Sequence, residues 1–127
     1  MGLFSFISKT AVAIDWNELK SENELHDAIE YSLNKPVLFF KHSTRCSISS
    51  MALSRFEDKW DTNEDCKLFF LDLLEYRSIS NLLAELTKVV HESPQVIVLY
   101  NEEVIYTASH SGINACEIND LLQKLNP

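Results

Sequence analysis

The sequence has few of the residues that interrupt regular structure or cross-link a chain. Its 127 residues include two glycines, three prolines and three cysteines. Without Gly/Pro-rich linkers or low-complexity tracts, residues 1–127 are expected to form one domain, long enough to bury a core without disulfides or metal. The apolar start, residues 1–15, lacks a basic leader region and is interrupted by Lys9, so it is interpreted as an N-terminal arm.

Basic residues are scarce as well. Eleven Lys and Arg face nineteen Asp and Glu, which gives a net charge of -8. This balance disfavours partners that are themselves anionic, such as nucleic acid or an acidic membrane surface. No apolar run approaches the roughly 18 residues of a membrane span. We therefore expect neither a nucleic-acid nor a membrane partner, and any positive site must be local.

The three cysteines, Cys46, Cys66 and Cys116, are too few and too widely spaced for a disulfide framework or a paired zinc motif. The four histidines show no ligand spacing with one another or with the cysteines, so no metal site is predicted. An odd cysteine count without a close pair is typical of a reducing compartment, and it predicts a cytoplasmic protein.

Hydrophobic periodicity predicts eight elements in the order helix, strand, helix, strand, helix, strand, strand, helix. The alternating first part indicates right-handed parallel crossovers, and the last two strands have hairpin spacing. The elements are a helix at 21–33 that opens on a Ser21/Glu24 capping box, a strand at 36–40, a helix from 47 to a turn at 61–63, a strand at 68–71, a helix at 77–90, strands at 95–100 and 104–107, and a helix ending near 125.

Cys46 lies in the stretch STRCSIS, where the strand at 36–40 gives way to a helix. A helix N-terminus and nearby cations both favour the reactive thiolate, and Lys41, His42 and Arg45 precede this cysteine. Such a local positive field would also suit an anionic thiol substrate. The alternative is an inert cysteine packed beneath the helix. Position and charge alone leave both interpretations open.

Two further positions bear on this turn. Ser49 stands where the second cysteine of a dithiol motif would be; its hydroxyl cannot attack a mixed disulfide but can donate a hydrogen bond to a thiolate. It could equally be an ordinary serine of the first helical turn. Ser93-Pro94 precedes the strand at 95–100, so Pro94 is either a strand-entry residue or a cis proline, and the sequence does not distinguish these.

The element order, the cysteine at a strand-to-helix turn and the later Ser-Pro together resemble the thioredoxin fold. More narrowly, FFKHSTRCSIS at 39–49 followed by SPQVIVLY at 93–100 resembles the monothiol bacilliredoxin family of the bacillithiol redox system. The resemblance covers about residues 16–125. It implies an α/β, thioredoxin-like fold with a central four-stranded mixed sheet, two parallel strands plus a C-terminal hairpin, flanked by helices.

The family implies a monothiol thiol-disulfide oxidoreductase. Cys46 would attack a mixed disulfide between a client protein and bacillithiol, take up bacillithiol and free the client. Bacillithiol would be a co-substrate, with no tightly bound cofactor. Ser49 would stabilise the thiolate, and Arg45 would supply positive charge.

The family also implies that Pro94 is a cis proline facing Cys46. Ser93, Thr44 and Ser47 would line the bound substrate. Ser47 departs from the pattern, because family members often carry proline directly after the cysteine. That difference affects the rigidity of the turn rather than the nucleophile.

The other two cysteines are expected to differ. Cys66 should lie at the opposite end of the sheet, roughly 20 Å from Cys46, too far to resolve it. Cys116 should lie nearer the active end, on the polar side of the last helix, where it is either a resolving or regulatory thiol or an ordinary exposed one.

Two other functions are considered. A redox-inert thioredoxin-fold module could use the Pro94 edge and the hairpin to dock a partner without chemistry. A monothiol glutaredoxin ranks lower, since its C-G-F-S motif and later Gly-Gly-Asp stretch are absent here.

Overall fold

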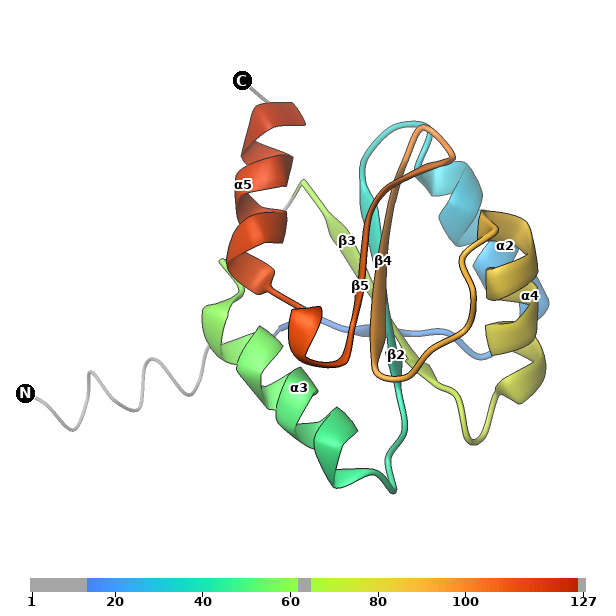
Figure 1. Cartoon of the computed structure of the whole chain (residues 1–127). Coiled ribbons are helices and arrows are strands. Elements are labelled where there is room, and N and C mark those ends of the chain that lie inside the picture. Colours follow the sequence, from blue (N-terminus) through green and yellow to red (C-terminus); the bar gives the residue numbers. More distant parts are fainter. Residues whose placement is uncertain (1–13, 62–64, 126–127) are drawn as a thin grey trace, which may run out of the picture.

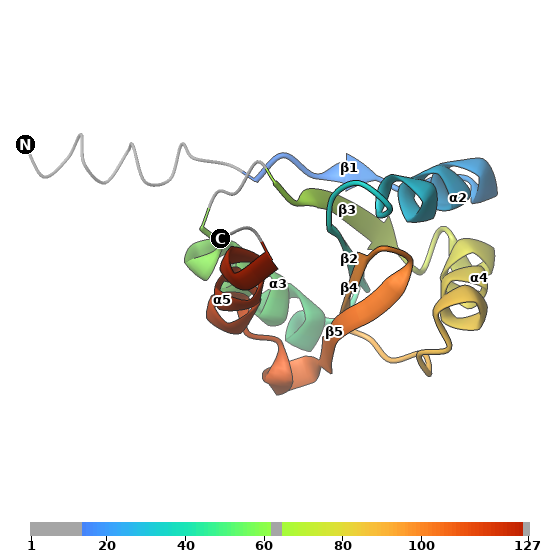
Figure 2. The same ribbon diagram turned by 90° about the horizontal axis from the view of Figure 1, so that it is seen from above.

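The computed structural model describes residues 14–61 and 65–125, which form a sheet with helices on both faces (Figures 1 and 2). The expected arm falls largely in residues 1–13, and the expected turn at 61–63 largely in 62–64; both stretches lie outside the described residues. The elements are β1 (Asn17–Glu18), α2 (Glu22–Tyr31), β2 (Val37–His42), α3 (Ser47–Lys59), β3 (Lys67–Asp72), α4 (Arg77–Thr87), β4 (Gln95–Tyr100), β5 (Glu103–Ser109), the 3-10 helix η1 (His110–Gly112) and α5 (Ala115–Leu125).

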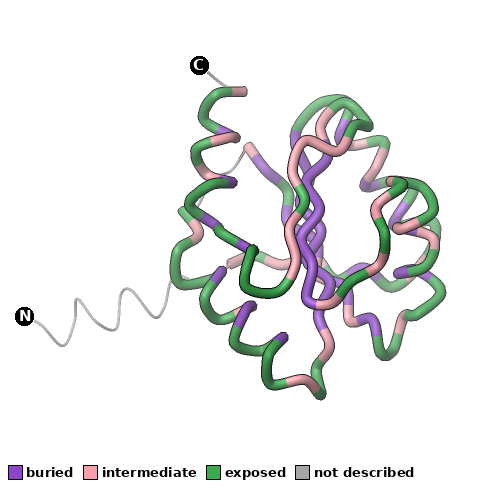
Figure 3. The backbone as a smooth tube through the Cα atoms, viewed as in Figure 1, coloured by how far each residue is buried: buried purple, intermediate pink, exposed green. Residues whose placement is uncertain are grey.

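The sheet has the strand order β1-β3-β2-β4-β5, with β2 at its centre. β2 pairs in parallel with β3 and antiparallel with β4, while β4 and β5 form the C-terminal hairpin. Every residue of β2 is buried, which agrees with its continuously apolar start. Figure 3 shows this buried centre enclosed by more exposed helices.

The four predicted strands are present, but the expected count of four is wrong, because β1 adds a fifth. β1 is two residues long and pairs in parallel with β3. The Leu19 N–H extends this pairing by donating to the Phe70 carbonyl at 2.9 Å. A two-residue strand is too short to produce the alternation by which strands are recognised in a sequence.

Successive β2 side chains point to opposite faces of the sheet and so enter two separate cores. Leu38 and Phe40 pack under α3 and α5, together with Phe56 of α3. Val37 and Phe39 pack under α2 and α4. Figure 2 shows the two helical layers on either side of the sheet. Within the described ranges, every helix is too short or too polar to cross a membrane.

The start of α2 is capped as predicted, since the Glu24 N–H donates to Ser21 Oγ at 3.1 Å.

Ser32, just after the end of α2, anchors the hairpin. Its Oγ accepts from the Glu102 N–H at 3.0 Å. Asn101 and Glu102 form the hairpin turn, both with positive φ, 56° and 64°. The connection is therefore a two-residue turn rather than the expected three residues.

The helix predicted at 77–90 ends earlier than its apolar pattern suggests. α4 stops at Thr87, and Lys88 adopts a left-handed conformation with φ 63°. Val90, the last residue of the predicted helix, lies beyond α4 and is 81% exposed. A left-handed residue ends an α-helix whatever apolar residues follow it, which explains the difference.

Candidate active site

Cys46 is the N-cap residue of α3, four residues after β2 ends. Its backbone is extended, and its side chain makes no capping hydrogen bond. The Cys46 N–H donates to the Ser43 carbonyl at 3.1 Å, and the Cys46 carbonyl accepts from the Ser50 N–H at 3.0 Å. The thiol is free and half-buried. A partly accessible sulfur is thus held at the positive end of a thirteen-residue helix.

Ser49 is completely buried one turn below Cys46. Its Oγ lies 2.7 Å from Nδ1 of His42 and accepts from the Ser43 N–H at 3.1 Å. The hydroxyl therefore links the end of β2, the turn and the helix. A hydrogen bond from Ser49 to a Cys46 thiolate remains a prediction, and it depends on where the hydroxyl proton points.

His42, the last residue of β2, is 5% exposed and lies under the same turn. Its ring contacts that of Phe70, with centroids 5.4 Å apart. Burial lowers the pKa of His42, and the carboxylates of Asp72 and Glu57 oppose this only in part. His42 is consequently neutral at physiological pH.

The cationic cluster expected before Cys46 is not an exposed group of three charges. Lys41 is fully buried, and by strand alternation it points to the α2/α4 face, away from His42. Burial lowers the pKa of Lys41 to about 8. Of the three, Arg45 is the exposed cation beside the cysteine. The missed signal is that β2 continues through 41 and 42, which forces two polar side chains into the interior.

Lys41 connects the centre of the sheet to the segment that carries Pro94. Its Nζ donates to Gln95 Oε1 at 3.0 Å. The same oxygen accepts from the Glu92 N–H at 3.4 Å, and Gln95 Nε2 donates to the Val90 carbonyl at 3.0 Å. This side-chain network ties residues 90–95 to the end of β2.

The Ser93–Pro94 peptide bond is cis. Gln95 pairs with Lys41 of β2, so Pro94 lies at the end of the sheet from which the Cys46 turn departs. The Pro94 carbonyl accepts from the His110 N–H at 3.0 Å. Ser93 Oγ is buried and has no hydrogen-bond partner within the described ranges. Pro94 and Ser93 thus lie at the same end of the sheet as the turn that carries Cys46 and the exposed Thr44 and Ser47.

Cys66 lies outside this site. It directly precedes β3, whose first residue pairs with Val37 at the start of β2. It is buried, and burial raises the pKa of its thiol to about 12. The expectation that Cys66 lies at the far end of the sheet is confirmed.

Cys116 is exposed in the first turn of α5. One turn further along α5, Asn119 Nδ2 donates to the carbonyl of Lys59, the last residue of α3. Cys116 therefore lies nearer the far end of α3 than the Cys46 end, and α5 leads away from the first turn of α3 (Figure 1). A resolving role for Cys116 has no support in this arrangement.

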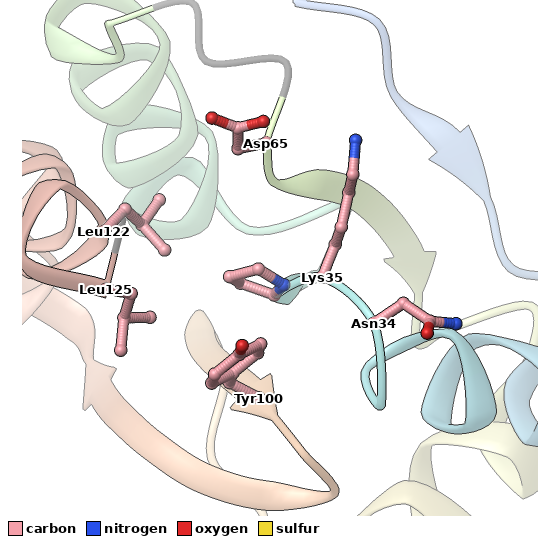
Figure 4. A pocket seen from close by; sticks show the side chains of 7 residues that line it. Asn34, Lys35, Asp65, Tyr100, Leu122 and Leu125 are labelled. Atoms are coloured by element: carbon pink, nitrogen blue, oxygen red, sulfur yellow. The ribbon is translucent and has the colours of Figure 1, made fainter. Parts of the chain in front are cut away.

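A cavity of about 170 Å³ opens at the end of the sheet opposite Cys46. Figure 4 shows Lys35, Asp65 and Tyr100 around it, with Leu122 and Leu125 of α5 on one side. The lining has no cysteine, so this cavity has no direct part in chemistry at Cys46. Within the described ranges there is also no group of three or more His, Cys, Asp or Glu side chains placed to hold a metal ion.

The fold, with one cysteine at the turn from β2 into α3, defines a thioredoxin-fold protein whose turn carries a single thiol. The chain belongs to the monothiol bacilliredoxin family, because the family model described as "Monothiol bacilliredoxin BrxC" matches residues 17–118. Membership gives it a general role in thiol redox chemistry.

Solved structures share the thioredoxin fold. A candidate oxidoreductase with a thioredoxin fold is 32% identical, with a TM-score of 0.71 over 88% of this chain and 95% of the other. Malassezia sympodialis thioredoxin is 16% identical, with a TM-score of 0.67 over 89% and 93%. Thioredoxin O2 from Arabidopsis thaliana is 17% identical, with a TM-score of 0.65 over 88% and 95%. The last two show the fold alone.

Proposed function

We propose that this protein removes bacillithiol from mixed disulfides on client proteins. The Cys46 thiolate attacks the bacillithiol sulfur, a new disulfide forms between Cys46 and bacillithiol, and the old disulfide breaks. The client sulfur leaves as a thiolate and takes a proton from solvent. An outside thiol then attacks the bacillithiol sulfur of the Cys46 adduct, forms a disulfide with bacillithiol and releases the Cys46 thiolate, so each exchange conserves electrons.

The observation that carries the proposal is one thiol at the turn from β2 into α3, with a serine in place of a second cysteine in the first turn of the helix. Cys46 is half-buried at the start of α3, and the buried position one turn below it is Ser49. Cys66 is buried at the other end of the sheet, and Cys116 lies in the first turn of α5, one turn before the residue that contacts the last residue of α3. The reaction at Cys46 therefore stops at the mixed disulfide.

Several groups around Cys46 are suited to hold the bound thiol. Arg45 offers an exposed cation for an anionic substrate, and Thr44 and Ser47 offer exposed hydroxyls. Ser93 Oγ is a buried hydroxyl that lacks a partner within the described ranges. A hydrogen bond from bound substrate would satisfy it.

The test is intact-mass analysis after mixing the protein with a bacillithiolated client. We expect wild type to gain one bacillithiol while the client loses it. Cys46→Ser should do neither. Cys116→Ser, a matched control on an exposed thiol, should behave as wild type.

Two outcomes would contradict the proposal. If wild type stays unmodified and the client keeps its adduct, the protein is a redox-inert binding module instead. If a glutathionylated client is resolved as fast as a bacillithiolated one, the chemistry stands but bacillithiol is not its preferred thiol.

A further inference from the structure

The short contact between His42 and Ser49 can be a hydrogen bond in either direction. Ser49 Oγ has one proton to donate and two lone pairs to accept with. One lone pair accepts from the Ser43 N–H, which can only donate. The remaining partner, His42 Nδ1 at 2.7 Å, either donates to Ser49 or accepts from it, according to the tautomer of the ring.

The two tautomers leave Ser49 in different states. If the ring carries its proton on Nε2, Ser49 donates to Nδ1 and has no proton left for another acceptor. If the proton is on Nδ1, the ring donates to Ser49, both lone pairs are filled, and the hydroxyl proton is free to point elsewhere. Cys46 is the N-cap residue of α3 and Ser49 is the third residue of the helix, a pair of positions whose groups approach each other in the first turn.

We propose that His42 is a positioning residue for the monothiol reaction: by donating Nδ1–H to Ser49, it directs the Ser49 hydroxyl proton to the sulfur of Cys46. The inference rests on the proposed function and specifies how that site holds its thiolate. It assigns His42 a role that the pattern of cations before Cys46 did not indicate.

The arrangement distinguishes the two states of Cys46. When the sulfur is an anion, a proton aimed at it is stabilising, which favours the Nδ1–H tautomer of His42. When the sulfur is in a disulfide it is a poor acceptor, and Ser49 can turn its proton to His42 instead. The shift moves one proton between the ring nitrogens through solvent and leaves the charge of His42 unchanged.

The surroundings of His42 support this role. Ring and hydroxyl are both buried, so each must find a partner inside the protein. The charged groups that act on His42 are Asp72 at the end of β3 and Glu57 of α3, and the Phe70 ring covers one side. Burial outweighs both carboxylates and lowers the pKa of His42, so the neutral ring with its two tautomers is the relevant form.

The test is a double-mutant cycle on the rate of Cys46 alkylation, read by peptide mass between pH 5 and 9. Ser49→Ala and His42→Leu should each slow Cys46 alkylation at pH 7 by about tenfold, the loss expected for one hydrogen bond to a charged group. His42→Asn places an amide N–H where Nδ1 stood, so it should recover the rate to within about twofold of wild type.

The double variant decides whether His42 acts through Ser49. If it does, Ser49→Ala/His42→Leu is no slower than Ser49→Ala alone. If the two rate losses multiply in the double variant, or if His42→Leu alone does not slow alkylation, the proposal is overturned. His26→Asn, at an exposed histidine of α2, is the matched control and should leave the profile unchanged.

Folding and function are read separately. Cys66 is buried, so its labelling by the reagent reports a variant that has unfolded. If His42→Leu exposes Cys66, the cycle is completed with Ser49→Ala and His42→Asn: alkylation of His42→Asn as slow as that of Ser49→Ala would overturn the proposal. Failure of wild type to remove bacillithiol would refute the proposed function, but the alkylation cycle would still decide the role of His42.

Discussion

Cys46 differs from the other two cysteines in both exposure and surroundings. It is the half-buried N-cap residue of α3, Cys116 is exposed in the first turn of α5, and Cys66 is buried within a core. Thiol reactivity follows the accessible thiolate rather than the presence of a cysteine. Accessibility therefore separates Cys66 from the two thiols that a reagent in solution can reach.

We expect iodoacetamide at pH 7.5 to label Cys46 and Cys116 of the folded protein and to spare Cys66. Burial closes access to Cys66 and raises the pKa of its thiol to about 12, so almost none is ionised at this pH. Peptide mass analysis would measure the three rates, and denatured protein serves as the control in which all three react. Labelling of Cys66 in folded protein at the rate of Cys116 would contradict this assignment.

A second residue-scale prediction concerns the missing resolving thiol. Ser49→Cys should let the chain clear its own adduct, because a thiol one turn below Cys46 can attack the mixed disulfide and release bacillithiol. Mass analysis should then show an oxidised protein two hydrogens lighter instead of a bacillithiol adduct. Ser54→Cys, exposed two turns along α3 and about 12 Å away, is the matched control and should keep the adduct. A persistent adduct on Ser49→Cys would show that the buried position cannot reach Cys46.

The strand-to-helix turn that carries Cys46 was predictable from the sequence, but not all of its surroundings were. Cys46 and Ser49 are recognisable because a motif places them at a strand-to-helix turn. The sequence groups His42 with the cations before Cys46, because the predicted strand ends at 40. β2 instead continues to His42, so Lys41 and His42 point to opposite faces of the sheet. Lys41 was misplaced for the same reason, and its partner Gln95 lies 54 positions away.

At the scale of elements, long periodic segments were predictable and short or strained ones were not. The four strands and four helices follow from apolar spacing, and α2 begins at its predicted cap. β1 has two residues and η1 has three, too few for any periodic pattern. α4 ends at a left-handed lysine rather than at the end of its apolar spacing, which only the backbone reveals.

The hairpin turn gives an element-scale prediction about stability. Asn101 and Glu102 both have positive φ, a conformation in which the second position strongly favours glycine. Glu102→Gly should raise the free energy of unfolding by about 0.5–1 kcal/mol, because it removes the strain of a side chain there while keeping the N–H that donates to Ser32. Chemical denaturation would measure the change.

The matched control is Glu103→Gly, one residue further along in β5. Glycine within a strand adds flexibility to the unfolded chain, so this variant should be less stable than wild type. Equal destabilisation by both substitutions would contradict the turn geometry.

At the scale of the whole molecule, an acidic protein keeps one lysine entirely inside. The net charge is -8, yet Lys41 is completely buried between two strands, with a neutral amide as its hydrogen-bond partner. Burying a charge without a counter-charge costs stability. The buried lysine belongs to the hydrogen-bond network around Gln95. This network fixes the segment that carries Pro94 beside the candidate active site.

Lys41→Met should therefore make the fold more stable at pH 7, by about 1–3 kcal/mol, while slowing thiol exchange. Burial lowers the pKa of Lys41 from 10.5 to about 8, so below pH 8 the lysine is charged in both folded and unfolded protein and the full penalty applies. Between pH 8 and 10.5 the folded protein loses this proton before the unfolded chain does, and the penalty is relieved as pH rises. The stability gap between variant and wild type should accordingly narrow across that window.

Urea denaturation at pH 7, 8.5 and 10 would measure this gap, with Lys124→Met on the exposed face of α5 as control. The control should change stability by only a few tenths of a kcal/mol at every pH, since an exposed lysine is solvated in both states. A stability gap that is constant or widens with pH would mean that folding does not lower the pKa of Lys41. Faster thiol exchange by Lys41→Met would show that the contact of Lys41 with the Pro94 segment does not support the reaction at Cys46. The destabilising buried charge would then have no role at the active site.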